Sequence, residues 1–366
     1  ARADAFDRNT RPCSTHRSAG RVVPDPFFLL ASEGWSGSVS WRGCMVNALS
    51  RRRRTIAVSS ALLIAAAGIL HAESAGSFHE ILVETDAHEG PVVVSDQNRL
   101  YFTTKPDFSA PDTHVSIRFV DLDTGAVEHF HDRSNMANGM WLTNDGAALL
   151  VAEQGTMETP GAISRFSLAD GSRTVLVDSF EGKPLNSPNK AIEASNGWIY
   201  FSDPDYGHNQ GFKPAPELPM AVYARNPEDG QVTRLTTELA RPHGLALSPD
   251  ERTLYIGDTD AIDGATPDDA DRSHGILAAD LVAPDRIGPL RDILSVPVGI
   301  PDGFVTRPSD GDILVGAGDG LRHYTSDGEL VALYPIASGA VNVTAQGETY
   351  FTTADTHIWQ PRIPAN

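Results

Sequence analysis

The chain repeats one short pattern about every fifty residues. Each copy has a polar residue, usually beside a glycine, then a short apolar strand, a Gly, Asp or Asn turn, and a second strand. The leading polar residues are Glu89, Asn138, Asn189, His243, Asp302 and Asn342. Successive leading residues are 49, 51, 54, 59 and 40 positions apart. A recurring period of this length is typical of repeat architectures.

Further strand-like runs lie between these segments, such as "HVSIRFVDLDTGAVEHF" and "GLRHYTSDGELVALY". Each contains an acidic residue and a glycine in a turn between alternating residues, which indicates a hairpin. Two hairpins per repeat give four strands, and four-stranded units repeated radially form a β-propeller. We therefore predict an all-β, six-bladed β-propeller with four-stranded blades over residues 73–366. A β-sandwich is the alternative, but it does not account for the regular period.

The propeller prediction gives the leading residues a common location. The innermost strand of each blade starts at one mouth of the central channel, so the six polar side chains should converge there. Two carboxylates and several amide oxygens around one axis need a cation or hydrogen-bond donors among them. Oxygen ligands of this kind suit Ca²⁺. In the alternative interpretation, these groups cap strand ends and hold ordered water in the channel.

The first 72 residues differ from the rest. Met45 is followed by four consecutive arginines at 51–54, an apolar run, and the small residue Ala72. This order is typical of a secretory signal peptide, and the apolar run is short for a membrane span. We predict a cleaved signal peptide over 45–72 and a periplasmic or secreted protein, with a buried N-terminal helix as the alternative. Residues 1–44 are interpreted as an over-extended reading frame or a disordered segment.

Excluding these 72 residues changes the charge and the cysteine content. They hold 10 Arg, no Lys and 4 acidic residues, which leaves 19 basic against 44 acidic residues in the remainder. Such a surface repels nucleic acid and anionic membranes and suits small neutral substrates or cations. Both cysteines, Cys13 and Cys44, also lie in the excluded part. Disulfides, thiolate catalysis and cysteine-bound zinc are therefore not expected. No protein partner is predicted.

Five motifs carry a family resemblance: "EGPVVV", "ANGMWLTNDGAALLVAEQ", "EGKPLNSPNKAIEASNGWIYFSDPDYG", "RPHGLALSPDERTLYIGDT" and "GIPDGFVTRPSDGDILVGAGDGL". In order and spacing, the chain resembles the SMP-30/gluconolactonase/LRE-like family over roughly residues 79–360. The resemblance implies a six-bladed propeller with a divalent metal, usually Ca²⁺, at one end of the channel. It also implies lactone hydrolysis or a related phosphotriesterase-like activity.

The resemblance assigns roles to individual residues. Glu89 and Asn189 resemble metal ligands of the family. Asp302 resembles a ligand that also acts in proton transfer or nucleophilic attack. His243 stands where the family motif has a ligand asparagine. Asn138 resembles a polar residue close to the substrate or the metal-bound water.

Two positions depart from the family pattern, Lys190 and His243. Lys190, in "SPNK", occupies a place that is often aspartate in the family. A cation there weakens Ca²⁺ binding unless it points away or contacts the substrate. We assign Lys190, together with Asn342, to the substrate-binding residues. Imidazole is a poor ligand for Ca²⁺ and a good one for Zn²⁺ or Mn²⁺. Four interpretations of His243 are open. It is a ligand that changes the metal preference, or it acts as a general base. Alternatively, it is a histidine that only caps a strand end, or it marks a protein that has lost the activity.

The predicted function is hydrolysis of a lactone or similar ester by a metal-dependent enzyme. A metal polarises the carbonyl, and Asp302 activates water, with His243 sharing the base role. Asn138 and Asn189 hold the substrate ring in place. Two alternatives stay open at this point. One is phosphotriester hydrolysis at the same site. The other is a non-catalytic binding propeller with a degraded metal site, which Lys190 and His243 would indicate.

Overall fold

Short antiparallel strands make up almost all the regular structure. The computed structural model describes residues 79–106, 108, 113–261 and 272–364, all within the contact unit Leu63–Asn366. The segments 1–44 and 45–72, the latter predicted as a signal peptide, lie outside the described residues. The described helices are the single turns η1 (Ser95–Gln97) and α1 (Tyr206–Asn209). None of the described helices is long and apolar enough to cross a membrane.

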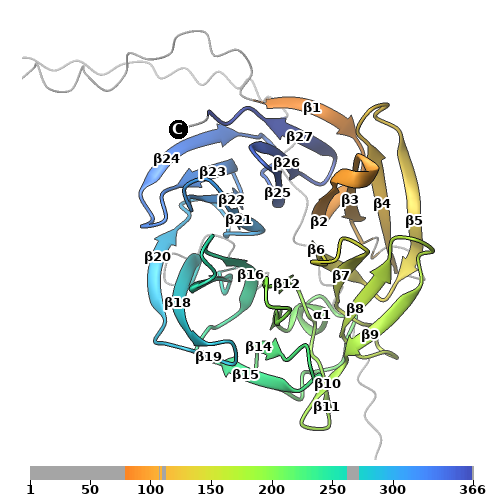
Figure 1. Ribbon diagram of the computed structural model, residues 1–366, viewed down its shortest axis with the longest axis vertical. Helices are drawn as coiled ribbons and strands as arrows, with labels where there is room; N and C mark the ends of the chain where they lie inside the picture. The colour runs from red at the N-terminus through yellow and green to blue at the C-terminus, as the bar shows by residue number, and fades with distance from the viewer. Residues whose placement is uncertain (1–78, 107, 109–112, 262–271, 365–366) are drawn as a thin grey trace, which may run out of the picture. The chain divides into compact units, whose positions relative to one another are not determined.

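Six antiparallel sheets surround one central axis (Figure 1), which confirms the predicted six-bladed propeller with four-stranded blades. Blade 1 contains β2 (Ala87–Val94), β3 (Arg99–Thr104), β4 (Val115–Asp121) and β5 (Val127–Ser134). Blade 2 contains β6 (Ala137–Leu142), β7 (Ala148–Glu153), β8 (Ala162–Ser167) and β9 (Arg173–Val177). Blade 3 contains β12 (Ala191–Glu193), β13 (Ile199–Asp203), β14 (Ala221–Arg225) and β15 (Val232–Thr236).

The other three blades follow the same order from the axis outward. Blade 4 contains β16 (Pro242–Leu247), β17 (Thr253–Asp258), β18 (Gly275–Ala283) and β20 (Arg291–Ser295). Blade 5 contains β21 (Phe304–Thr306), β22 (Ile313–Ala317), β23 (Gly320–Tyr324) and β24 (Leu330–Pro335). Blade 6 contains β25 (Asn342–Gln346), β26 (Thr349–Thr353), β27 (His357–Pro361) and β1 (His79–Glu84).

The outer edges hold features that the repeat did not predict. The outermost strand of blade 6 is β1, from the opposite end of the described chain, and its Glu84 pairs with His357. This pairing closes the ring of blades. In blade 4, β19 (Arg286–Ile287) adds a fifth strand beside the end of β18. Between blades 2 and 3, β10 (Ser179–Phe180) and β11 (Lys183–Pro184) form a small hairpin.

The core is divided among the interfaces between neighbouring blades. Strand β7 shows how this arises: Leu149 packs toward blade 1, and its neighbour Leu150 packs toward blade 3. Every residue of β7 is buried. Because side chains alternate across a strand, a strand buried on both faces reads as a continuous apolar run. Six such clusters join blade to blade around the axis, with blade 6 packed on blade 1 through Ile358 and Phe102.

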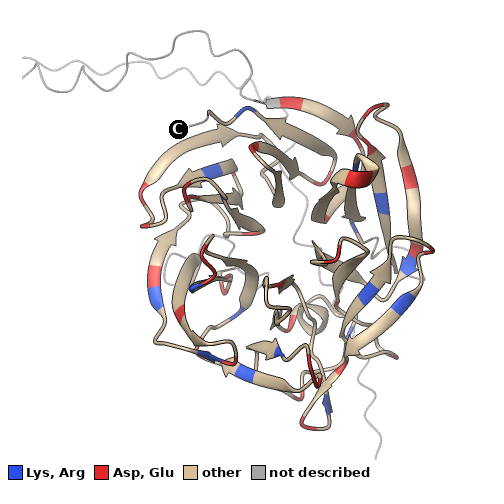
Figure 2. Cartoon of the chain, in the orientation of Figure 1, with Lys and Arg blue, Asp and Glu red and all other residues tan. Residues whose placement is uncertain are grey.

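Many Lys and Arg residues lie on the outer strands of the blades (Figure 2). Figure 2 shows Lys and Arg on outer strands such as β5, β9, β15 and β20, while Asp and Glu recur at the turns. Some charged residues nevertheless lie on or next to inner strands. Glu89 and Lys190 are two such residues, and both are buried.

One buried cation ties blade 5 to blade 6. Arg307, in the turn between β21 and β22, is 1% exposed. Its Nε donates to Tyr350 Oη at 3.2 Å, and its Nη2 lies 3.2 Å from Glu348 Oε2. Its Nη1 lies 3.3 Å from Asp310 Oδ2 within its own turn. The guanidinium thus adds polar contacts between two blades that otherwise meet through apolar packing.

We expect Arg307→Leu to lower the free energy of unfolding by about 2 kcal/mol. Breaking a fully buried ion pair costs about 3–5 kcal/mol, and the cost is smaller here because Glu348 is partly exposed. Urea unfolding measures the change. In the control Arg362→Ala, the removed ion pair with Glu80 is exposed, so the loss should stay below about 1 kcal/mol. Equal effects of the two variants would contradict the structural role of Arg307.

Candidate metal centre and catalytic site

The six leading residues meet at one mouth of the channel, as the repeat predicted. Two contacts join leading residues directly, and a third joins Asn189 to Gly139, the residue after Asn138. Asn342 Nδ2 donates to Glu89 Oε2 at 2.5 Å, from blade 6 to blade 1. His243 Nε2 lies 3.4 Å from Asp302 Oδ1, from blade 4 to blade 5. The backbone N–H of Gly139 donates to the carbonyl of Asn189 at 2.8 Å, from blade 2 to blade 3.

The remaining neighbours are joined through their backbones. Ser202 at the end of β13 donates its hydroxyl to the His243 carbonyl at 2.6 Å. Thr103 at the end of β3 donates in the same way to the Asn138 carbonyl at 3.3 Å. Between blades 5 and 6 the approach is closest, because a Cβ on Gly303 would lie 2.0 Å from Asn342 Cγ. Glycine therefore follows the leading residue where the next inner strand must come close. We call the closed set of six residues the polar ring.

Three members of the polar ring form a candidate metal centre. Glu89, His243 and Asp302 each offer one ligand atom, and these atoms lie within 4.8 Å of one another. Glu89 is 3% and His243 is 5% exposed, whereas the Asp302 side chain is 24% exposed. Asp302 is thus partly buried but the most exposed of the three donors, and Glu89 and His243 lie below the surface.

The electrostatics of this cluster fit a divalent cation. Burial and the neighbouring Glu89 carboxylate raise the pKa of Asp302 well above its usual range. The two carboxylates therefore repel one another when nothing positive lies between them. Burial lowers the pKa of His243, so its imidazole is neutral at pH 7 and keeps a lone pair for a metal. Two carboxylates and one imidazole suit Zn²⁺ or Mn²⁺ as well as the Ca²⁺ expected from oxygen ligands.

The His243 ring is oriented by its neighbour Tyr206 in α1. The two rings meet edge to face, with centroids 5.5 Å apart and an interplanar angle of 88°. The Tyr206 hydroxyl is hydrogen-bonded to Thr259, which fixes the phenol. His243 Nδ1 is buried and has no hydrogen-bond partner among the described residues. The ring is therefore positioned by packing and by the contact of Nε2 with Asp302.

Lys190 is buried instead of being exposed at the mouth. Its Nζ donates to the Met140 carbonyl at 3.0 Å and lies 5.8 Å from the centroid of the Trp141 ring. Burial lowers the pKa of Lys190 to about 8, and Glu89 opposes this shift. The ammonium is thus held against the inner strand of blade 2. Its predicted contact with substrate stays a prediction.

The asparagines of the ring are buried as well. Asn138 Oδ1 is a buried acceptor without a hydrogen-bond partner in the described part of the chain. Such an oxygen is stabilised by a cation, a water molecule or a substrate hydroxyl. Asn189 is 4% exposed, and its backbone N–H donates to the Ser202 carbonyl at 3.1 Å. The structure thus brings the predicted residues together, while their separate roles remain predictions.

Three buried carboxylates at the ends of second strands were not predicted as part of the site. Glu153, Asp203 and Asp258 end β7, β13 and β17, and each accepts at least one backbone N–H from the segment that leads into the ring residue of its own blade. The bonds are Asn135 N to Glu153 Oε1 at 3.1 Å, Ser187 N to Asp203 Oδ1 at 2.8 Å, and Arg241 N to Asp258 Oδ1 at 2.8 Å. The recurring acid in "LLVAE", "IYFSD" and "LYIGD" is the signal that would have revealed them.

Comparisons with known proteins identify the family and several relatives of the chain. A family model described as "SMP-30/Gluconolactonase/LRE-like region" matches residues 89–355. A gluconolactonase from Zymomonas mobilis is 36% identical over 180 residues, which are 47% of this chain and 49% of that protein. A lactonohydrolase from Aspergillus oryzae is 30% identical over 185 residues, which are 49% of this chain and 42% of that protein. The chain thus spans about half the length of the curated relatives it matches.

A solved structure is similar over most of the propeller. It is that of a gluconolactonase from Xanthomonas campestris, with a TM-score of 0.65 and 30% sequence identity. The match covers 77% of this chain and 88% of that one.

Proposed function

The chain belongs to the SMP-30/gluconolactonase/LRE-like family, and on that basis we propose that it is a divalent-metal-dependent hydrolase of lactones or similar esters. The proposal is supported by the relatives named gluconolactonase and lactonohydrolase. The observation that carries it is the cluster of Glu89, His243 and Asp302 at the mouth of the channel. Two adjacent carboxylates repel one another, so a repeat that served only the fold would not be expected to place them together.

The residues of the polar ring divide the chemistry among them. Asp302 is the more exposed of the two carboxylates, so it accepts a proton from the water that attacks the lactone carbonyl. The ring C–O bond then breaks, and the proton passes from Asp302 to the departing oxygen, giving a hydroxy acid. Asn138 offers a buried amide oxygen for a substrate hydroxyl, and Asn189 lies beside it on the next blade.

Glu89, His243 and Asp302 would hold the metal, with Asn189 as an additional amide ligand. When bound, a divalent cation supplies a Lewis acid that polarises the lactone carbonyl. Glu89 is fixed for this purpose by the hydrogen bond from Asn342. Ca²⁺ is the cation expected from the oxygen ligands, and Zn²⁺ or Mn²⁺ is favoured by the imidazole of His243.

Removal of the metal tests the proposal. We expect the purified protein to hydrolyse glucono-1,5-lactone, to lose this activity on treatment with EDTA, and to regain it with one of Ca²⁺, Mn²⁺ or Zn²⁺. Acid release measured with a pH indicator, corrected for spontaneous hydrolysis, reports the rate. A folded protein that binds no metal and hydrolyses no lactone in a chelator-sensitive manner would rule the proposal out. Faster turnover of a phosphotriester would favour the phosphotriesterase alternative instead.

We also propose that the protein is exported. This rests on the basic and apolar pattern of residues 45–72, which lie outside the described residues. Fractionation of cells that express the full chain, followed by N-terminal sequencing, tests it. Cleavage near Ala72 in the exported fraction is the expected result, and an uncleaved intracellular chain would contradict it.

A further inference from the structure

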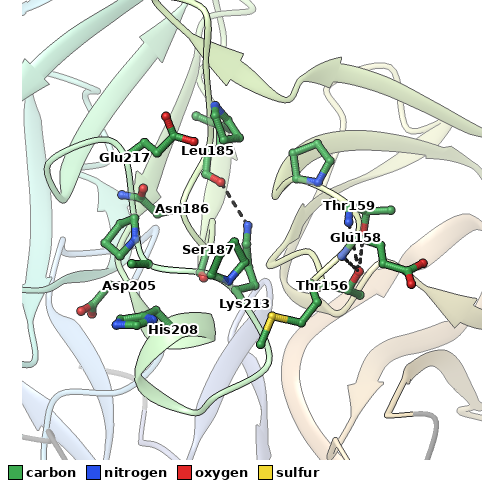
Figure 3. A pocket seen from close by; sticks show the side chains of 16 residues that line it. Thr156, Glu158, Thr159, Leu185, Asn186, Ser187, Asp205, His208, Lys213 and Glu217 are labelled. Carbon is green, nitrogen blue, oxygen red and sulfur yellow. Dashed lines mark hydrogen bonds between the residues drawn. The ribbon is translucent and has the colours of Figure 1, made fainter. Parts of the chain in front are cut away.

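A pocket of about 300 Å³ opens beside the polar ring, between the loops of blades 2 and 3 (Figure 3). It is lined by segments 156–160, 184–187 and 213–217, together with Asp205 and His208. The first and last of these segments follow second strands, and the middle one leads into an inner strand. All three therefore lie at the same mouth of the propeller as the polar ring.

The pocket adjoins the polar ring at two points. Ser187, in its wall, precedes Asn189 by two residues, so their Cα atoms are at most about 7 Å apart. Asp205, also in the wall, is followed by Tyr206, whose ring contacts that of His243. Residues of the pocket wall thus lie next in the chain to residues that form or contact the polar ring.

The wall contains a buried acceptor that lacks a donor. Asn186 is 5% exposed and lines the pocket. Its Nδ2 donates to the Leu218 carbonyl at 3.2 Å and to the Asp203 carbonyl at 3.4 Å. These two bonds fix the orientation of the amide, since a flipped amide would place its oxygen against two carbonyls. Asn186 Oδ1 then has no hydrogen-bond partner among the described residues, although buried acceptors are normally satisfied by a donor.

The same wall offers buried donors. Lys213 is 6% exposed, and its Nζ donates to the Leu185 carbonyl at 3.0 Å. An ammonium group has three N–H donors. Within the part of the chain that the structure describes, no second hydrogen bond of this group occurs beside the bond to Leu185. The wall thus presents an acceptor and donors together, which is the pattern that hydroxyl groups bind.

Charge and shape exclude most other ligands. Lys213 is the single Lys or Arg in the lining, whereas Glu158, Asp205 and Glu217 are acidic. Asp205 is paired with Arg241. An anion would therefore meet the carboxylates of Glu158 and Glu217, and a cation would meet Lys213. A neutral unit with several hydroxyls avoids both conflicts, and the four prolines of the lining offer apolar faces to its C–H groups. The volume lies at the small end of the range for ligand pockets, about 300–1,000 Å³.

We propose that this pocket is a subsite for a second polyhydroxylated unit of the substrate. The substrate class is then an aldonolactone that carries a further sugar, with the lactone at the polar ring and the second sugar in the pocket. This inference rests on the proposed lactonase function.

The test compares lactones of one and two sugar units. We expect the wild type to have a kcat/KM for cellobiono- or maltobiono-1,5-lactone that exceeds the value for glucono-1,5-lactone by roughly 10-fold or more. Ala215 is exposed and lines the pocket, so Ala215→Trp should fill it without disturbing the core. This variant should abolish the preference and leave glucono-1,5-lactone turnover unchanged. Lys213→Met should reduce the preference in the same direction.

A matched control and a binding measurement complete the test. Ala169→Trp, at an exposed turn between β8 and β9, should change neither rate. Isothermal titration with the disaccharide alditols cellobiitol and maltitol should show binding to the metal-free wild type and not to Ala215→Trp. If no lactone is hydrolysed but an alditol still binds in this manner, the lactonase proposal fails and the sugar pocket stands. Equal turnover of both lactone sizes, or equal loss on both in Ala215→Trp, would overturn the subsite.

Discussion

Asp302→Asn should lower kcat/KM for a lactone by about 10²–10⁴-fold, the usual contribution of a positioned general base. An amide has nearly the shape of the carboxylate but does not accept the proton of the attacking water. Initial rates on glucono-1,5-lactone measure the loss. Asp250→Asn is the matched control, because Asp250 is an exposed turn residue that bonds to Ser248 and the Arg252 backbone. Its activity should equal that of the wild type.

Although Asp302→Asn should lower the activity, it should make the metal-free protein more resistant to unfolding as the pH rises. Burial and Glu89 raise the pKa of Asp302 in the folded state, so ionising this residue costs more in the folded protein than in the unfolded chain. In EDTA, the wild type should lose stability as the pH rises from about 4 toward the raised pKa, and Asp302→Asn should lose less. Thermal unfolding at several pH values measures this. A variant that is inactive and also unfolds more readily at pH 8 in EDTA would point to a folding defect instead of a lost base.

His243→Asn should reverse the metal preference of the site. An amide oxygen suits Ca²⁺, and an imidazole nitrogen suits Zn²⁺ or Mn²⁺. The variant should bind Ca²⁺ more tightly than the wild type does. Loss of a hydrogen-bond partner of a metal ligand typically lowers metal affinity by about 10–100-fold. Because His243 is itself a ligand in this proposal, the affinity of His243→Asn for Zn²⁺ should fall by more than that. Titration calorimetry on EDTA-stripped protein provides both affinities.

A second histidine on the surface supplies the control for this exchange. His129 lies on the outer strand β5 with a side chain that is 61% exposed, so His129→Asn should leave both affinities unchanged. If His243→Asn also leaves them unchanged, His243 is not a ligand. The ring would then hold its metal through the carboxylates and amides, and the edge contact with Tyr206 would be a packing feature only.

Much of the fold was predictable because the repeat is visible in the residues. The leading polar residue and the apolar strand recur in each blade, and a glycine follows the leading residue in four of the six, since every inner strand faces the same channel and a close neighbour. Gly303 shows the reason, because a side chain there would overlap Asn342. The convergence of Glu89, His243 and Asp302 followed from the period alone, as equivalent positions in a radial repeat meet at the axis.

Other features depended on contacts between distant segments. Strand β1 completes blade 6 by pairing with β27, the last described strand, and no local pattern marks "HEILVE" as its partner. Arg307 reads as a turn residue, although its guanidinium reaches Tyr350 in the next blade. The direction of the Lys190 side chain likewise depends on the Met140 carbonyl of the neighbouring blade.

The sequence by itself thus determined the architecture, the membership of the polar ring and the unusual imidazole at His243, because these depend on residue type and spacing. The tertiary structure alone decided which ring carboxylate is the more exposed, where the charge of Lys190 lies, and that a pocket forms next to residues that flank the ring. These features depend on burial and on the lack of a hydrogen-bond donor for Asn186 Oδ1. Both arise only when loops from different blades pack together.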